Sequence, residues 1–306
     1  MDIILEWCKG EDMSYVKKLY KRGLITPPKH VIDSIQLEVE TGSVAYGVST
    51  DHSDVDICGF SIPRKAMIFP HLRGEIQGFG KQTQRFDQWQ QHHVQDKDCN
   101  KEFDFNIYGI TKFFQLCMDN NPNMIGLLYT PIRCVLFTTK IGEMVRENRK
   151  LFLHKGAWHK FKGYSYSQIH KMKTKIPTGK RKETIEKFGY DVKFGLHCIR
   201  LLNEIEQILT EHDLDLERNR EQLKSIRRGE WSMEDILEYF NKKEKELETL
   251  YTSSTLQHSP NEPKIKQLLI DCLEEYYGDL SSAIIIPNKT ENLIKDLEGL
   301  VERYKK

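Results

Sequence analysis

The stretch Gly42-Ser43-Val44-Ala45-Tyr46-Gly47, followed by Ser53-Asp54-Val55-Asp56, decides the fold of this chain. Apolar and polar residues alternate over residues 34–41, which predicts a half-buried strand that ends at the Gly-Ser pair. A glycine at the first turn position lets the main chain approach an oxyanion closely. The hydroxyl of Ser43 adds a donor beside the N–H groups that open a predicted short helix, and such a turn binds phosphates without a lysine.

Asp54 and Asp56 are separated by one residue. In a strand this spacing points both side chains to one face, while Val55 and Ile57 point to the core. Two adjacent carboxylates repel each other and are tolerated where a divalent cation neutralises them. Hard oxygen ligands of this kind suit Mg²⁺ or Mn²⁺ held jointly with the phosphates of a substrate. The pair therefore predicts a metal site.

A site that holds two metal ions usually needs a third carboxylate, which binds the metal at the attacking oxygen. Asp104 is the candidate. Its neighbours Phe103, Phe105 and Ile107 alternate, which predicts a strand with the carboxylate on the opposite face. Glu102 shares that face and is the reserve. Gly-Ser and Asp-x-Asp pairs are each common in loops, but their order along the chain makes the combination specific.

At these motifs the chain resembles the predicted nucleotidyltransferases of the DNA polymerase beta superfamily that occur in bacteria and phages, some of them associated with RNA repair. The resemblance runs from about Val39 to beyond Leu209. Further matching segments are Phe103-Asp104 through Lys112-Phe113, Asn121-Pro122-Asn123, Gly163 to Gln168, and Gly189 to Lys193 with His197, Arg200, Leu201 and Leu202. One departure is Gly126, because family members often carry an acidic residue soon after the Asn-Pro turn.

The resemblance implies an α+β fold. A small mixed-sheet nucleotidyltransferase core over residues 1–150 would be followed by a helical domain over residues 151–306 that completes the substrate cleft. It implies an enzyme that transfers NMP from an NTP to a hydroxyl acceptor with Mg²⁺ or Mn²⁺, the favoured acceptor being an RNA 3′ end, such as that of a tRNA under repair. Transfer onto a protein or small molecule is the enzymatic alternative, and a non-catalytic RNA-binding module is the other.

By the same resemblance, Asp54, Asp56 and Asp104 are the catalytic and metal-binding residues, and Gly42 and Ser43 hold the triphosphate. The remaining nucleotide-binding candidates come from the turn and from the downstream helices: Tyr46, Tyr164, Gln168, Lys193, His197 and Arg200. The tyrosine at 164 would stack on a base and the amide one turn later would read its edge. A core aromatic with a surface amide is the simpler alternative.

Lys193, His197 and Arg200 recur at helical spacing and share one face. On periodicity alone an ordinary solvated face is favoured, because Glu204 continues the row. The resemblance reverses this preference and makes the row a phosphate-binding one. His197 stays open between a nucleotide contact and a partner of Asp191 or Glu204.

Residues 171–182 contain basic side chains and no acid, and a proline and a glycine interrupt them. We expect this loop to contact a phosphate backbone at the mouth of the site, through Lys175, Lys180, Arg181 and Lys182. A solvated loop is the alternative. Arg227-Arg228 forms a minor second basic cluster.

The long polar stretch 69–100 is a candidate substrate-facing flap. It contains a group of possible zinc ligands, namely His92, His93, Asp96, Asp98 and Cys99. Adjacent histidines without a spaced pair match no tetrahedral zinc pattern well, so zinc is disfavoured. Beyond Arg149 the periodicity is almost wholly helical. The expected helices cover residues 158–172, 188–205, 231–251, 265–277 and 293–304.

Charge and cysteine usage limit the other possibilities. The 306 residues include 46 Lys and Arg against 45 Asp and Glu, so any nucleic-acid surface must be local. The seven cysteines form no C-x-x-C pair, which predicts reduced core thiols at Cys58, Cys117 and Cys198 and a cytoplasmic location. A secretion signal and a membrane span are not expected. The pattern leaves the oligomeric state undetermined.

Overall fold

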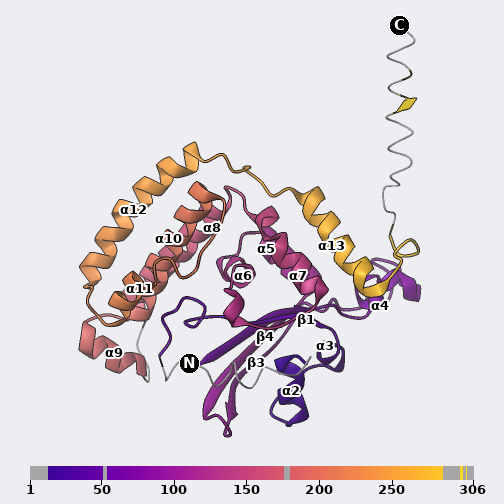
Figure 1. Cartoon of the computed structure of the whole chain (residues 1–306), viewed down its shortest axis with the longest axis horizontal. Coiled ribbons are helices and arrows are strands. Elements are labelled where there is room, and N and C mark those ends of the chain that lie inside the picture. Colours follow the sequence, from indigo (N-terminus) through magenta and orange to yellow (C-terminus); the bar gives the residue numbers. More distant parts are fainter. Residues whose placement is uncertain (1–12, 51–53, 176–179, 285–296, 299–300, 302–306) are drawn as a thin grey trace.

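The computed structural model describes residues 13–50, 54–175, 180–284, 297–298 and 301. It contains a mixed sheet and a helical C-terminal portion, which confirms the predicted α+β class. Figure 1 shows most helices of the second half gathered above one face of the sheet, with two short helices below the other face.

The strands are β1 (Ile35–Glu40), β2 (Val55–Ser61), β3 (Gln88–Asp96), β4 (Lys101–Gly109) and β5 (Val135–Thr138). They lie in the order β3-β4-β2-β1-β5. β2 and β4 are parallel, and the other neighbouring pairs are antiparallel. A parallel pair needs a long connection. Here the connection contains β3, which returns to form the edge of the sheet beside β4.

The helices of the first half are α2 (Tyr15–Lys21), α3 (Lys29–Ile32), α4 (Lys65–Ile68), α5 (Ile110–Met118), α6 (Pro122–Leu128) and α7 (Lys140–Glu147). Those of the second half are α8 (Ala157–Thr174), α9 (Lys180–Phe188), α10 (Val192–Glu211), α11 (Arg220–Arg227), α12 (Met233–Ser253) and α13 (Glu262–Tyr277). Single 3-10 turns are η1 (Pro70–Arg73), η2 (Ile132–Cys134) and η3 (Arg149–Phe152).

One predicted helix boundary is wrong. Phe188 was expected at the start of the helix that contains Ile205, but it ends α9 instead. Gly189 has a φ of +79°, a left-handed conformation that stops a helix, and Asp191 then caps α10 by accepting the backbone N–H of Lys193. The expected helix over residues 293–304 lies almost wholly outside the described residues.

The strand β1 is buried on both faces, and the prediction of a half-buried strand was wrong. Its polar residues find partners inside the protein. The carboxylate of Glu38 accepts the backbone N–H groups of Tyr15 and Val16 at the start of α2. The amide of Gln36 accepts the hydroxyl of Thr139 at the start of α7. The alternation of polar and apolar residues in β1 therefore reflects contacts of its polar side chains with the starts of α2 and α7. It does not indicate that one face of the strand lies in water.

The hydrophobic core continues past residue 150. One buried cluster joins side chains of the sheet and α5, such as Phe60 and Phe113, to side chains of α8 and α10, such as Phe161 and Leu201. The cysteines of the described part are free thiols, and Cys117 and Cys198 are buried. Among the described helices, none has the length and apolarity that crossing a membrane requires.

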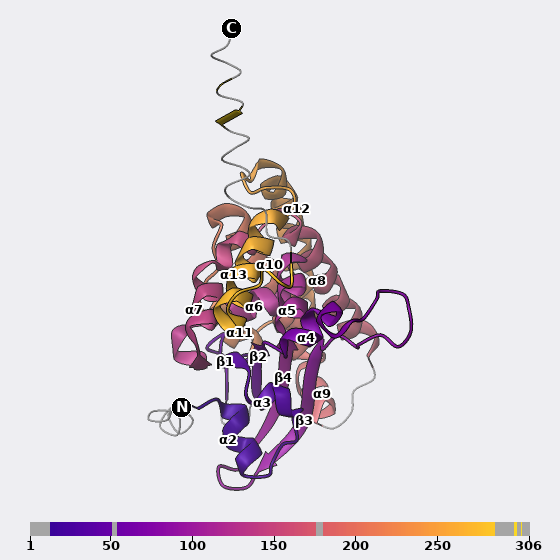
Figure 2. The same ribbon diagram turned by 90° about the vertical axis from the view of Figure 1, so that its right-hand side faces the viewer.

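The segment between η1 and β3 projects from the body of the protein, on the right of Figure 2. The side chain of Gln82 accepts the N–H of Gly78 and donates to the carbonyl groups of Ile76 and Phe79, so it holds the tip in shape. The large apolar side chains at the tip face solvent, and Phe79 is 75% exposed. The stretch predicted as a flap, residues 69–100, thus contains this projecting arm, residues 74–87, and the edge strand β3.

Candidate active site

Asp56 and Asp104 lie side by side on adjacent strands. β2 and β4 are parallel, and their register pairs these two residues directly. The residues that flank them fill the opposite face of the sheet, and all are buried: Val55, Ile57, Phe103 and Phe105. Asp54 immediately precedes β2 and is exposed. One-residue spacing on one strand and parallel register with the next therefore bring the predicted acids to one region of one sheet face.

The local charges favour a bound cation. Burial raises the pKa of Asp56, and the neighbouring carboxylate of Asp104 raises this pKa further. Asp54 acts in the same direction, whereas Lys193 and His92 lower the pKa of Asp56. Like charges held this close cost free energy unless a positive charge joins them. Carboxylate oxygens from adjacent strands fit hard divalent cations such as Mg²⁺ and Mn²⁺.

The Gly-Ser turn lies directly against Asp56. Gly42 has a φ of +66°, and a Cβ on it would lie 2.3 Å from the Oδ2 atom of Asp56. The backbone N–H of Thr41 donates to the carbonyl of Asp56 at 2.8 Å. The expected short helix after the turn is absent from the described chain, because residues 42–47 form consecutive turns. Ser43 is half-buried, and its carbonyl accepts the N–H of Val48.

Two arginines hold this turn from other parts of the chain. Arg133 donates to the carbonyl of Val44 at 3.0 Å and to the carboxylate of Glu217 at 2.7 Å. Arg227 at the end of α11 donates to the carbonyl of Val48. The sequence indicated neither contact, since it placed Arg227 only in a minor basic cluster and did not single out Arg133. Both arginines shape the loop that faces the acids.

Tyr46 and Arg200 contact each other across the core. The Nη1 atom of Arg200 donates to the hydroxyl of Tyr46 at 2.6 Å and to Glu204 at 2.8 Å, and its guanidinium lies 4.6 Å from the centre of the Tyr46 ring. The arginine is only 7% exposed. Gly126 makes room for the tyrosine, because a Cβ there would lie 3.1 Å from the Tyr46 hydroxyl. This packing accounts for the glycine after the Asn-Pro turn.

The other candidates for nucleotide contacts lie on α8 and α10. Lys193 is exposed in the first turn of α10, near enough to Asp56 to affect its pKa. His197, one turn further along, is half-buried. On α8, Gln168 is half-buried, and the hydroxyl of Tyr164 accepts the side-chain amide of Asn121 at 3.1 Å. Tyr164 is thus tied to the Asn-Pro turn.

The basic segment is more helical than predicted, because α8 continues to Thr174 and α9 begins at Lys180. The ammonium of Lys175 lies 5.6 Å from the ring centre of Phe194, at the start of α10. Lys182 is exposed, with Glu186 3.9 Å away. The side chains of Lys180 and Arg181, and residues 176–179, lie outside the described part of the chain.

The predicted group of zinc ligands is divided in the structure. Asp96 and Asp98 both pair with Arg22, which binds the carboxylate of Asp96 through two nitrogens. His92 and His93 point instead towards Asp104 and Glu102. Sequence reasoning did not connect these histidines with the acids of β4, because the contact arises from strand pairing.

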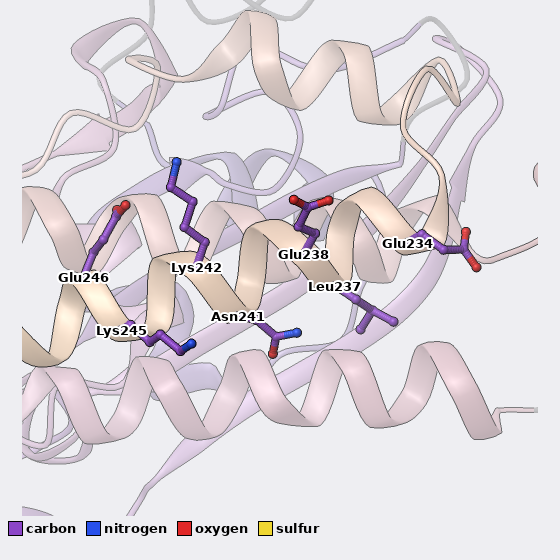
Figure 3. Close-up of a pocket in the computed structure, with 7 residues that line it drawn as sticks. All are labelled: Glu234, Leu237, Glu238, Asn241, Lys242, Lys245 and Glu246. Carbon is purple, nitrogen blue, oxygen red and sulfur yellow. The ribbon is translucent and has the colours of Figure 1, made fainter.

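One hollow of the surface lies away from these acids. Its volume is about 770 Å³, and every residue that lines it belongs to α12, as Figure 3 shows. Its ionisable side chains are Glu234, Glu238, Lys242, Lys245 and Glu246, so both signs of charge are present. This lining contains none of the predicted site residues.

The comparison with known families agrees with the site. The model of the RlaP family, described as the RNA repair pathway DNA polymerase beta family, matches residues 25–271, which include the Gly-Ser turn, the three aspartates and helices α8 to α12. No match was found among the curated proteins. Because the family model covers most of the chain, the protein belongs to the RNA repair pathway DNA polymerase beta family.

Proposed function

We propose that this protein is a metal-dependent nucleotidyltransferase that transfers NMP from an NTP to the 3′ hydroxyl of an RNA. The observation that carries the proposal is the direct pairing of Asp56 with Asp104 beside a glycine turn that approaches Asp56. Family membership supports nucleotidyl transfer in RNA repair. The proposal adds the metal, the substrate and the acceptor.

In this proposal Asp54, Asp56 and Asp104 hold Mg²⁺ or Mn²⁺. When bound, these ions neutralise phosphate charge and lower the pKa of the attacking hydroxyl. The backbone N–H groups at Gly42 and the hydroxyl of Ser43 bind the outer phosphates. Most of the rate enhancement comes from positioning and charge complementarity, without a covalent intermediate.

The downstream helices complete the nucleotide site. Lys193 is the best-placed cation for a phosphate, because it is exposed and acts electrostatically on Asp56. Tyr164 and Gln168 present a ring and an amide to the base, and His197, half-buried one turn after Lys193 on α10, is a further candidate for a nucleotide contact. Tyr46 and Arg200 act indirectly, because their polar groups bind each other. The proposal also includes two domains, a nucleotidyltransferase core over residues 1–150 and a helical domain over residues 151–306.

The acceptor is proposed to be RNA, such as a tRNA with a damaged 3′ end, in the cytoplasm. Lys175, Lys180, Arg181 and Lys182 give this segment of the sequence a local positive charge, in a chain whose net charge is only +1. Such side chains bind a phosphate backbone without reading its sequence. Transfer onto a protein or small molecule is the rival that uses the same acids.

The test is incubation with each α-labelled NTP, Mg²⁺ or Mn²⁺, and total cellular RNA. We expect label on RNA with the wild-type chain and none with Asp54→Asn. Joint reversal of Lys180 and Arg181 to Glu should lower RNA labelling, whereas reversal of Lys242 and Lys245 on α12 should not. Label on a polypeptide, unaffected by the first reversal, would favour the rival. Undiminished turnover by Asp54→Asn would refute the metal role of that residue.

A further inference from the structure

The edge strand β3 bends over the carboxylates of β4. Its register with β4 shifts between Gln91 and Val94, so His92 and His93 form a bulge. His93 has a φ of +57°, a conformation that residues other than glycine seldom adopt. Its backbone N–H donates to the Oδ1 atom of Asp104 at 2.8 Å. The bulge thereby fixes this histidine above Asp104.

The side chain of His93 adds a nitrogen donor to this group of oxygens. Its Nδ1 atom lies 2.5 Å from an oxygen of Glu102. One donor atom each from His93, Glu102 and Asp104 lies within 4.8 Å of the other two. The two acids are partly shielded, with side chains 30% and 28% exposed, and the imidazole is open to solvent. Together they form a mixed nitrogen and oxygen donor set.

The composition of this set bears on the choice of metal. Mg²⁺ prefers oxygen ligands and keeps several waters. Imidazole nitrogen suits first-row transition metals and carboxylate oxygen suits Mn²⁺, so a set with both donor types favours a divalent transition metal over Mg²⁺. The aspartates at 54 and 56 offer only oxygen. The β3 bulge therefore supplies the nitrogen donor that these two aspartates lack.

We infer that His93, Glu102 and Asp104 form a binding site for a divalent transition metal of the Mn²⁺ type, which shares Asp104 with the catalytic acids. The inference deepens the proposed function and rests on it for the role of Asp104 in catalysis, while the metal site itself can be measured without turnover. It assigns a metal-binding function to His93 and Glu102, two residues that take no part in the pairing of Asp56 with Asp104. The shared carboxylate makes the site continuous with the proposed cleft.

Pulsed electron paramagnetic resonance of the full chain with Mn²⁺, without nucleotide, tests this site. A directly bound imidazole gives a nitrogen coupling that carboxylates and water cannot give. We expect this coupling in the wild-type chain and its loss in His93→Asn, a substitution chosen because asparagine tolerates the left-handed backbone. The affinity for Mn²⁺ should fall about tenfold. The affinity for Mg²⁺ should change less than about twofold.

His92→Asn is the matched control, since His92 is the adjacent imidazole and lies 3.5 Å from Asp104. It should keep the nitrogen coupling. Glu102→Gln should lower Mn²⁺ affinity while the chain stays folded by circular dichroism, so the test does not depend on one variant. Absence of nitrogen coupling in the wild-type chain, or its loss only in His92→Asn, would overturn the inference.

The outcome separates this site from the proposed function. If the wild-type chain shows the nitrogen coupling but transfers no NMP under any condition, the proposed function fails and the metal site stands. If NMP transfer occurs and His93→Asn binds Mn²⁺ as tightly as the wild-type chain, the metal site fails and the proposed function stands.

Discussion

Glu38 is a buried acid on β1, and Asp56 is a half-buried acid on the neighbouring strand β2. The surroundings of the two carboxylates differ. Glu38 accepts two backbone N–H groups at the start of α2, including that of Val16 at 3.0 Å. Asp56 faces a second carboxylate, Asp104, across the strand pair. The first acid is satisfied by the chain itself. The second has a repulsive neighbour, which is the pattern expected of a binding site.

The comparison separates stability from function on the two faces of the sheet. Helix α2 and the buried apolar side chains packed between that helix and the sheet cover Glu38 completely. Around Asp56, the cover is a turn held by Arg133 and Arg227, and Lys193 stands nearby. Substitutions on the Glu38 face should therefore act on stability alone, whereas substitutions on the Asp56 face should also change metal or nucleotide binding.

The largest effect on folding is expected at Glu38. Burial raises the pKa of this carboxyl from 4.5 to about 7, so between these values the folded chain keeps a proton that the unfolded chain has lost. The wild-type free energy of unfolding should therefore fall as pH rises through this interval. Relative to Glu38→Gln, the loss should reach about 3 kcal/mol.

Urea unfolding of both proteins at several pH values between about 4 and 8 measures this difference. Glu143→Gln, which changes an exposed side chain of α7, is the control substitution. Parallel curves for the wild-type chain and Glu38→Gln would show that Glu38 does not exchange a proton on folding.

On the other face, Gly42→Ala should cost about 1–2 kcal/mol of folding stability, because alanine resists the left-handed backbone. It should weaken metal binding as well, since its Cβ would displace the Asp56 carboxylate. Gly80→Ala is the matched control, with a φ of +68° and no atom within 4 Å of the added Cβ. Calorimetric titration with Mn²⁺ should distinguish the two variants. Equal metal affinities would mean that Gly42 is needed only for its backbone.

Tyr46→Phe should lower the free energy of unfolding by about 1 kcal/mol, because it removes the hydroxyl that accepts from Arg200. Tyr190→Phe is a fair comparison, since that hydroxyl donates to the carbonyl of Trp231 and, among the described residues, forms no hydrogen bond with Arg200 or the turn. Both variants should lose similar stability. Only Tyr46→Phe should raise the KM for NTP, because only it loosens the turn. An unchanged KM would place the Tyr46–Arg200 contact outside the function.

The smallest expected effect is a gain. Asp56→Asn removes a carboxylate whose pKa is raised by burial and by Asp104, so without metal it should stabilise the fold by roughly 0.5–1 kcal/mol. The gain should grow as pH rises, because the wild-type penalty applies to the ionised form. Thermal unfolding with chelator present measures it. A loss of stability would mean that the Asp56 carboxylate is structurally satisfied.

Local pattern was sufficient for most of the long helices and for the facing of the acids, but it missed α9 and predicted a short helix where residues 42–47 form turns. The alternation around Asp56 and Asp104 has a period of two, and strand pairing preserves it. It was insufficient wherever a side chain is satisfied by a distant segment. Glu38 and Gln36 look like solvent-facing residues until α2 and α7 are in place, and Arg200 meets Tyr46 across 154 positions of sequence. The bulge at His93 likewise depends on its partner strand.

The central claim is that Asp54, Asp56 and Asp104 together hold the ions for nucleotidyl transfer. The most direct measurement is transfer of labelled NMP to RNA by the wild-type chain, by each Asp→Asn variant, and by Glu38→Gln as the control acid from the other face. We expect turnover in the wild-type chain and in Glu38→Gln at a pH below about 7, and loss of at least about a thousandfold in each aspartate variant. Turnover retained by Asp56→Asn or Asp104→Asn would contradict it.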